Sequence, residues 1–213
     1  MDQMKNELIR IGIGGPVGAG KTLLIEKLLP KMIVDGLNVV VVTNDLVTKE
    51  DAARLKDSGL IDPDHIVGVE TGACPHTAIR EDPAANLCAV ERLSSLYDPD
   101  IVFVESGGDN LASTFSPDLV DYWIFMIDCA AGHDIPRKRG LGVLKADLVL
   151  VNKADIAAFV GTSLEKMAQG MEEVRPDRAW LMSSLLNDED VQEIYATLRQ
   201  QLPFKRRADA ATT

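Results

Sequence analysis

Short apolar runs recur along this chain and are separated by longer segments of mixed polarity. The runs lie at residues 8–13, 37–42, 66–69, 101–104, 123–127 and 148–151, and residues 179–182 are a further candidate. Several of them are rich in β-branched residues and apolar at almost every position. Strands of this kind are typical of a parallel sheet that carries helices on both faces.

Helices are predicted between these runs. The first ends near Asp35, because Gly36 is a common helix stop. Short helical segments are also expected at 49–60, after Pro83, near 162–173 and at 188–201. Apolar residues share one face at Leu87, Val90, Leu93 and Leu96 in the helix after Pro83, and at Val191, Ile194, Leu198 and Leu202 in the last helix. The alternation of buried strands and helices predicts an α/β fold, a three-layer sandwich with a mostly parallel central sheet.

Composition narrows the class of protein. The 213 residues suit a single domain over 4–204, followed by a flexible tail at 205–213. A net charge of -11 argues against nucleic acid and anionic membranes as partners, because both need positive charge on the protein. The three cysteines are widely spaced, so no disulfide framework is expected, and Cys88 and Cys129 are interpreted as core residues. No apolar run has the length of a membrane span, and we expect a cytoplasmic protein.

The first strand and first helix enclose a phosphate-binding loop. Its pattern, G-x-x-x-x-G-K-T, consists of Gly15, Pro16, Val17, Gly18, Ala19, Gly20, Lys21 and Thr22. Glycines allow the backbone to approach a phosphate closely, and the helix start aims several N–H groups at it. Lys21 is expected against the β- and γ-phosphates, and the Thr22 hydroxyl on Mg²⁺.

Acidic residues follow several strands at the edge where this loop lies. Asp45, Glu70 and Glu105 each end an apolar run and are candidates for the Mg²⁺ shell, directly or through water. Asp45 and Glu70 are therefore grouped with Lys21 and Thr22 as candidate catalytic residues. No dedicated base for the attacking water stands out, so slow intrinsic hydrolysis is expected.

The sequence Asn152-Lys153-Ala154-Asp155 follows another apolar run and indicates the base. The carboxylate of Asp155 can accept hydrogen bonds from guanine N1–H and the 2-amino group, whereas adenine lacks both donors. Asn152 is expected to brace the loop and Lys153 to lie along the base. This motif, downstream of a phosphate loop, favours GTP over ATP.

Cys74 and His76, separated by Pro75, offer a thiolate and an imidazole that suit Ni²⁺ or Zn²⁺. Two ligands are too few for tight binding, but a two-fold homodimer would supply two sulfurs and two nitrogens. Because the pair closely follows Glu70, a nucleotide-dependent movement could assemble or break such a site.

Several motifs together resemble the UreG family of urease accessory GTPases. They are Gly15–Thr22, Thr43-Asn44-Asp45 with 48–51, Gly68–Asp82, Glu105–Leu111, Ile135–Lys138 and Asn152–Asp155, in that order within about residues 8 to 175. The resemblance implies a P-loop GTPase that delivers nickel and forms a homodimer when GTP and metal are bound. It places the metal pair on Cys74 and His76, and the Mg²⁺ and switch carboxylates on Asp45 and Glu70. Its partners are the other urease accessory proteins, including a nickel donor, and urease.

Departures from the family pattern leave related functions open. Near residues 183–187, where a lysine-containing loop beside the base is expected, the chain has Ser-Ser-Leu-Leu-Asn. One alternative is a GTPase metallochaperone for another nickel or cobalt enzyme, of the hydrogenase or cobalamin type. A small-molecule P-loop kinase is a second, and a scaffold that uses nucleotide only for stability is a third. The kinase hypothesis predicts phosphate transfer to an acceptor and requires an arginine-bearing lid. The sequence does not indicate such a lid.

Overall fold

The structure is a computed structural model, and it describes residues 8–45, 50–71, 77–108, 111 and 114–204. The predicted metal pair, Cys74 and His76, and the tail after residue 204 lie outside the described residues. No helix within the described ranges is long and apolar enough to cross a membrane.

All seven described strands join one sheet, and every neighbouring pair is parallel. The strands are β1 (Ile9–Gly14), β2 (Val39–Asp45), β3 (Ile66–Glu70), β4 (Ile101–Glu105), β5 (Tyr122–Asp128), β6 (Leu148–Asn152) and β7 (Trp180–Met182). Their order across the sheet is β3-β2-β4-β1-β5-β6-β7. The prediction of an α/β fold with a mostly parallel sheet is confirmed.

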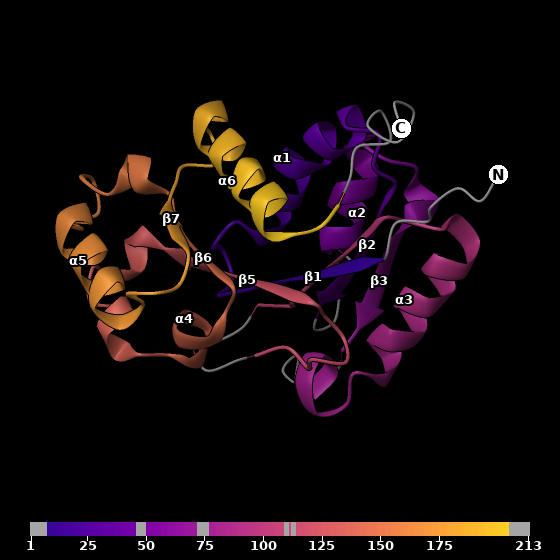
Figure 1. Cartoon of the computed structure of the whole chain (residues 1–213), viewed down its shortest axis with the longest axis horizontal. Coiled ribbons are helices and arrows are strands. Elements are labelled where there is room, and N and C mark those ends of the chain that lie inside the picture. The colour runs from indigo at the N-terminus through magenta and orange to yellow at the C-terminus, as the bar shows by residue number, and fades with distance from the viewer. Residues whose placement is uncertain (1–7, 46–49, 72–76, 109–110, 112–113, 205–213) are drawn as a thin grey trace.

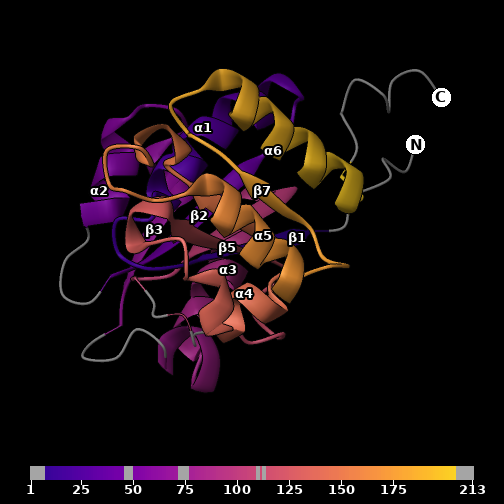
Figure 2. The same ribbon diagram turned by 90° about the vertical axis from the view of Figure 1, so that its left-hand side faces the viewer.

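Helices cover both faces of this sheet and make three layers (Figure 1). They are α1 (Lys21–Val34), α2 (Glu50–Asp57), α3 (Ala84–Tyr97), α4 (Leu141–Lys145), α5 (Leu164–Val174) and α6 (Asp188–Gln201). Helices α1, α2 and α6 pack on one face, in a core with Ile11 and Ile13 of β1. Helices α3, α4 and α5 pack on the other, with Val102 and Phe125. Figure 2, turned by 90°, again shows α1 and α6 above the sheet and α3 and α4 below it.

Two details of the predicted packing are wrong. Cys88 is exposed on α3, whereas Cys129 is buried as expected. Leu96, which the sequence pattern predicts on the apolar face of the same helix, is 61% exposed. That helix packs through Val90 and Leu93, and in its last turn Tyr97 rather than Leu96 continues this contact. Short helix α4 was not predicted, because it contains a glycine and only five residues.

The site is positioned by the point where the sheet changes direction. From β1 the chain builds outward through β2 and β3, returns with β4, and then crosses to β5 on the other side of β1. Ligands of open parallel sheets bind beyond the carboxyl ends of strands at such a reversal. The carboxyl end of β1 leads directly into Gly15 and the phosphate loop, so this loop sits at that position.

Candidate functional site

The phosphate loop has the backbone that its glycines predict. Gly15, Gly18 and Gly20 have φ angles of 138°, 80° and 100°, which side chains disfavour. A Cβ atom on Gly15 would also lie 2.3 Å from the carbonyl oxygen of Met126 in β5. The loop is therefore pressed against the neighbouring strand, and its residue before α1, Gly20, delivers the backbone into the helix in a left-handed conformation.

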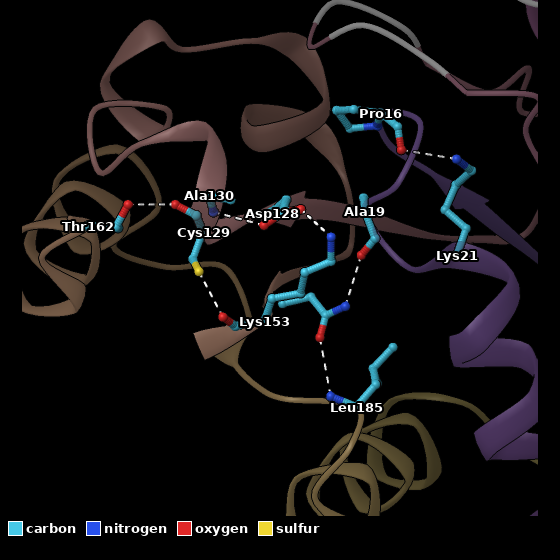
Figure 3. A network of polar contacts seen from close by, with 10 residues as sticks. Pro16, Ala19, Lys21, Asp128, Cys129, Ala130, Lys153, Thr162 and Leu185 are labelled. Atoms are coloured by element: carbon cyan, nitrogen blue, oxygen red, sulfur yellow. Dashed lines mark hydrogen bonds and ion pairs between the residues drawn. The ribbon is translucent and has the colours of Figure 1, made fainter. Parts of the chain in front are cut away.

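Lys21 closes over this loop from the first turn of α1. Its ammonium donates to the carbonyl oxygen of Gly15 at 3.0 Å, and the residue is buried. It also donates to the carbonyl oxygen of Pro16 at 3.1 Å (Figure 3). These bonds hold a positive charge at the mouth of the loop, where the phosphates of a nucleotide are expected. The contact of Lys21 with the phosphates stays a prediction.

Thr22 carries the hydroxyl that the motif assigns to Mg²⁺. Its Oγ1 lies 2.7 Å from Oε1 of Glu105 at the end of β4, and 3.1 Å from Oδ1 of Asp51 in the first turn of α2. The hydroxyl has only one proton to donate, so two carboxylates converge on a group that can satisfy one of them. Asp51 was not among the predicted site residues.

Glu105 is the most perturbed acid of the described chain. It is 1% exposed, and its second oxygen, Oε2, has no hydrogen-bond partner within the described residues. Burial, together with the nearby charge of Asp51, raises the pKa of Glu105 to about 8, although Thr22, Lys21 and Arg54 act in the opposite direction. A buried carboxylate oxygen without a partner, beside a hydroxyl and a second carboxylate, is a donor set that suits a hard cation such as Mg²⁺.

Asp45 and Glu70 lie at the same edge of the sheet but on strands farther from the loop. They stand opposite each other in the register of β2 and β3. Asp45 is half-buried and Glu70 is exposed. Strand β4 separates β2 from β1, so Glu105 is the residue paired with Ile13, next to the loop. The role assigned to Asp45 and Glu70 stays a prediction.

Asn152, at the end of β6, ties the base side of the site to the phosphate side. Its amide donates to the carbonyl oxygen of Ala19 in the phosphate loop at 2.9 Å, and its Oδ1 accepts from the N–H of Leu185 at 3.2 Å. The N–H of Ala154 in turn donates to the carbonyl of Ser183 at 3.0 Å. The 183–187 segment therefore lies beside the guanine motif, as expected, without a lysine.

In the rest of the guanine motif, Lys153 is held by its neighbours and the carboxylate of Asp155 is exposed to solvent. Lys153 has a φ of 64°, and its ammonium pairs with Oδ2 of Asp128 at 2.5 Å (Figure 3). Its carbonyl accepts a bond from the thiol of Cys129, whose pKa is raised by burial and by the charges of Asp128 and Asp155. Thr162 donates to the carbonyl of Cys129 at 2.8 Å and anchors the same loop. Asp155 itself is exposed, so its carboxylate is accessible to a base.

No group of three or more His, Cys, Asp or Glu side chains within the described ranges is arranged to hold a metal ion. The site assembled by the fold thus contains the loop, Lys21, Thr22 with Glu105 and Asp51, and the guanine motif. Asp51 could be found in the sequence only through its place in the 48–51 motif, because nothing local indicates that its helix start faces Thr22.

A glycine loop at the switch point of a parallel sheet, continuous with a helix and closed by a lysine, defines a P-loop nucleotide-binding protein. The family model described as "CobW/HypB/UreG, nucleotide-binding domain" matches residues 9–182. The chain belongs to this family of nucleotide-binding proteins.

Individual relatives agree with this assignment. Urease accessory protein UreG of Mycolicibacterium gilvum is 60% identical over 180 residues, which are 84% of this chain and 87% of the relative. Urease accessory protein UreG 2 of a Bradyrhizobium species is 50% identical over 92% of both chains. Among solved structures, hydrogenase maturation factor HypB from Archaeoglobus fulgidus has a TM-score of 0.71 and 25% identity, covering 91% of this chain and 90% of its own. HypB from Helicobacter pylori, solved in complex with nickel, has a TM-score of 0.75 and shares the fold at 19% identity, over 93% and 88% of the two chains.

Proposed function

We propose that this chain is a GTP-switched nickel chaperone that acts in the assembly of urease in the cytoplasm. The observation that carries the proposal is the pair of hydrogen bonds made by the Asn152 side chain. Its amide donates to Ala19 of the phosphate loop and its oxygen accepts from Leu185, so the guanine motif and the phosphate loop form one nucleotide site. The family, and relatives named urease accessory proteins at 50 to 60% identity, support the same function.

In this site Lys21 would contact the β- and γ-phosphates, and Asp155 would accept from the guanine edge. Thr22, with Glu105 and Asp51, fits Mg²⁺, which when bound would neutralise charge on the transferred phosphate. Asp45 and Glu70 would respond to the γ-phosphate from the adjoining strands. Because these residues supply positioning and charge rather than a base, intrinsic hydrolysis of GTP is slow and is accelerated inside an accessory complex.

The metal would be shared in a homodimer that forms when GTP is bound. Cys74 and His76 of two chains would supply two sulfurs and two nitrogens, which suits Ni²⁺ and also accommodates Zn²⁺. Hydrolysis would then open the dimer and release the metal to urease through the other accessory proteins.

Titration of Ni²⁺ in the presence and absence of a non-hydrolysable GTP analogue tests this proposal. We expect one metal per two chains with the analogue, weaker binding without it, and loss of binding in Cys74→Ala, with nucleotide affinity retained. One metal per chain, unchanged in Cys74→Ala, would refute it. In parallel, Asp155→Asn should reduce the preference for GTP over ATP at least about tenfold, since it loses a charge-assisted pair of hydrogen bonds.

The likeness to HypB structures favours one second candidate, a chaperone of the same chemistry for a hydrogenase. Activation assays that mix this chain with apo-urease and its accessory proteins, or with an apo-hydrogenase, separate the two clients.

A further inference from the structure

Two buried asparagines form a reciprocal amide pair between β2 and α3. Nδ2 of Asn44 donates to Oδ1 of Asn86 at 3.0 Å, and Nδ2 of Asn86 donates to Oδ1 of Asn44 at 2.8 Å. Both residues are 0% exposed. Asn44 is the penultimate residue of β2, and Asn86 lies in the first turn of α3, so the pair joins the sheet to a helix.

The second N–H of each amide extends the pair in opposite directions. Asn44 donates to the backbone carbonyl of Glu105 at 2.9 Å, and Asn86 donates to the backbone carbonyl of Ala78 at 2.9 Å. All four amide N–H groups are therefore used, and both side-chain oxygens accept. Turning either amide over would set oxygen against oxygen, so the pair has one arrangement that satisfies it.

The two outer contacts belong to different parts of the proposed function. The side chain of Glu105 accepts a hydrogen bond from the Thr22 hydroxyl, and its backbone carbonyl accepts one from Nδ2 of Asn44. Ala78 belongs to the turn Thr77–Glu81, which directly follows the pair predicted to bind nickel. The same turn is anchored by Ile79, which is buried and whose carbonyl accepts from the N–H of Ser116 at 2.8 Å.

We infer that Asn44 and Asn86 are positioning residues that couple the occupancy of the Thr22–Glu105 site to the turn Thr77–Glu81, and through it to metal binding. The last step rests on the proposed function. The physical reason is that β4 cannot shift by itself while all the hydrogen bonds of this pair are kept. A displacement of the Glu105 backbone either moves Asn44, Asn86 and Ala78 together or leaves buried donors without acceptors. A buried N–H group without an acceptor costs free energy, so joint movement of these residues is favoured.

Three variants separate coupling from stability. In Asn86→Asp the shape is kept and Asn44 still has an acceptor, but the carboxylate has no N–H for Ala78 and sets its second oxygen against Oδ1 of Asn44. In Asn86→Leu the pair is removed from one side. In the double variant Asn44→Leu/Asn86→Leu both buried amides are gone, so part of the stability returns while the link to Ala78 stays absent. The matched control is Asn38→Asp, because Asn38, the residue before β2, donates to the carbonyl of Tyr97 at the far end of α3 at 2.6 Å.

The measurement is hydrogen–deuterium exchange of the peptide covering residues 77–86, without nickel, with and without Mg²⁺ and a non-hydrolysable GTP analogue. In the wild type and in Asn38→Asp, nucleotide should slow exchange in this peptide. In Asn86→Asp and in the double variant the effect should shrink by a factor of roughly 2 to 30, the range for residues that carry coupling. Nucleotide protection at residues 15–22 in all variants shows that the folded protein binds the analogue.

Undiminished protection of 77–86 in Asn86→Asp, or no protection in the wild type, overturns the inference. Repeating the series with Ni²⁺ separates it from the proposed function. If the exchange result holds and nickel affinity does not depend on nucleotide even in the wild type, the coupling to the turn stands and the chaperone proposal fails. If nickel affinity depends on nucleotide equally in the wild type and in Asn86→Asp, the positioning role fails and the chaperone proposal stands.

Discussion

Replacing Glu105 by glutamine should make the metal-free protein more stable at neutral and alkaline pH. The pKa of Glu105 is raised from 4.5 to about 8 in the folded protein, first by burial and then by the charge of Asp51. Between these two values the native state holds a proton that the unfolded chain has released. The free energy of unfolding therefore falls as pH rises through this interval. The stability that protonated Glu105 contributes is fully present below about pH 4.5 and is lost by about pH 8.

The size of the effect follows from the same interval. About 3.5 pH units at about 1.4 kcal/mol each correspond to about 5 kcal/mol of unfolding free energy as an upper bound. Glu105→Gln keeps the shape and an oxygen that can accept from Thr22, and it does not titrate. We therefore expect the variant to exceed the wild type by roughly 2 to 4 kcal/mol at pH 8 and to approach it near pH 5.

Urea denaturation in EDTA, without nucleotide, at several pH values from 5 to 8.5 measures this difference. Glu91→Gln, on the exposed side of α3, is the control and should follow the wild type throughout. A difference between Glu105→Gln and wild type that stays constant over this range would refute the reasoning. The order should reverse with Mg²⁺ and a GTP analogue, which should stabilise the wild type more than the variant.

Three further predictions concern the scaffold. Gly142→Ala would bring a Cβ within 2.4 Å of the ring of Phe125, and this overpacking should lower the Tm by roughly 2 to 12 °C in calorimetry. Arg175→Met should cost about 1 to 3 kcal/mol in urea denaturation, because the guanidinium of this 2% exposed residue donates to backbone carbonyls before β6 and β7. Burial opposes the shift at Asp121, but hydrogen bonds and charge from Arg10 lower its pKa, so this pair stabilises above the ordinary pKa of an aspartate and is lost as pH falls below it. In Asp121→Asn the loss of unfolding free energy as pH falls through the acid range should be smaller by less than about 1 kcal/mol, since the pair is partly exposed. An unchanged dependence of the unfolding free energy on acid pH would contradict the assignment.

Much of the fold could be predicted because its signals are local. Runs such as 37–42 and 148–151 are apolar on both faces, and this pattern requires a covered parallel sheet wherever the strands are placed. The loop Gly15–Thr22 and the motif Asn152–Asp155 are equally local, since each depends on a few neighbouring residues with special backbone angles or donors. The exposure of Cys88 could not be predicted in the same way, because it depends on which face of α3 meets the sheet.

The sequence by itself determined the phosphate loop, the guanine motif and the class of sheet that carries them. Only the tertiary structure decided what surrounds Thr22. Because β4 is inserted between β1 and β2, Glu105 reaches a hydroxyl that lies 83 residues earlier in the chain. The same insertion brings the carbonyl of Glu105 to Asn44, which lies 61 residues away and is paired with Asn86. Such contacts depend on strand order and on the docking of α3, which are set by packing the whole core rather than by any local pattern.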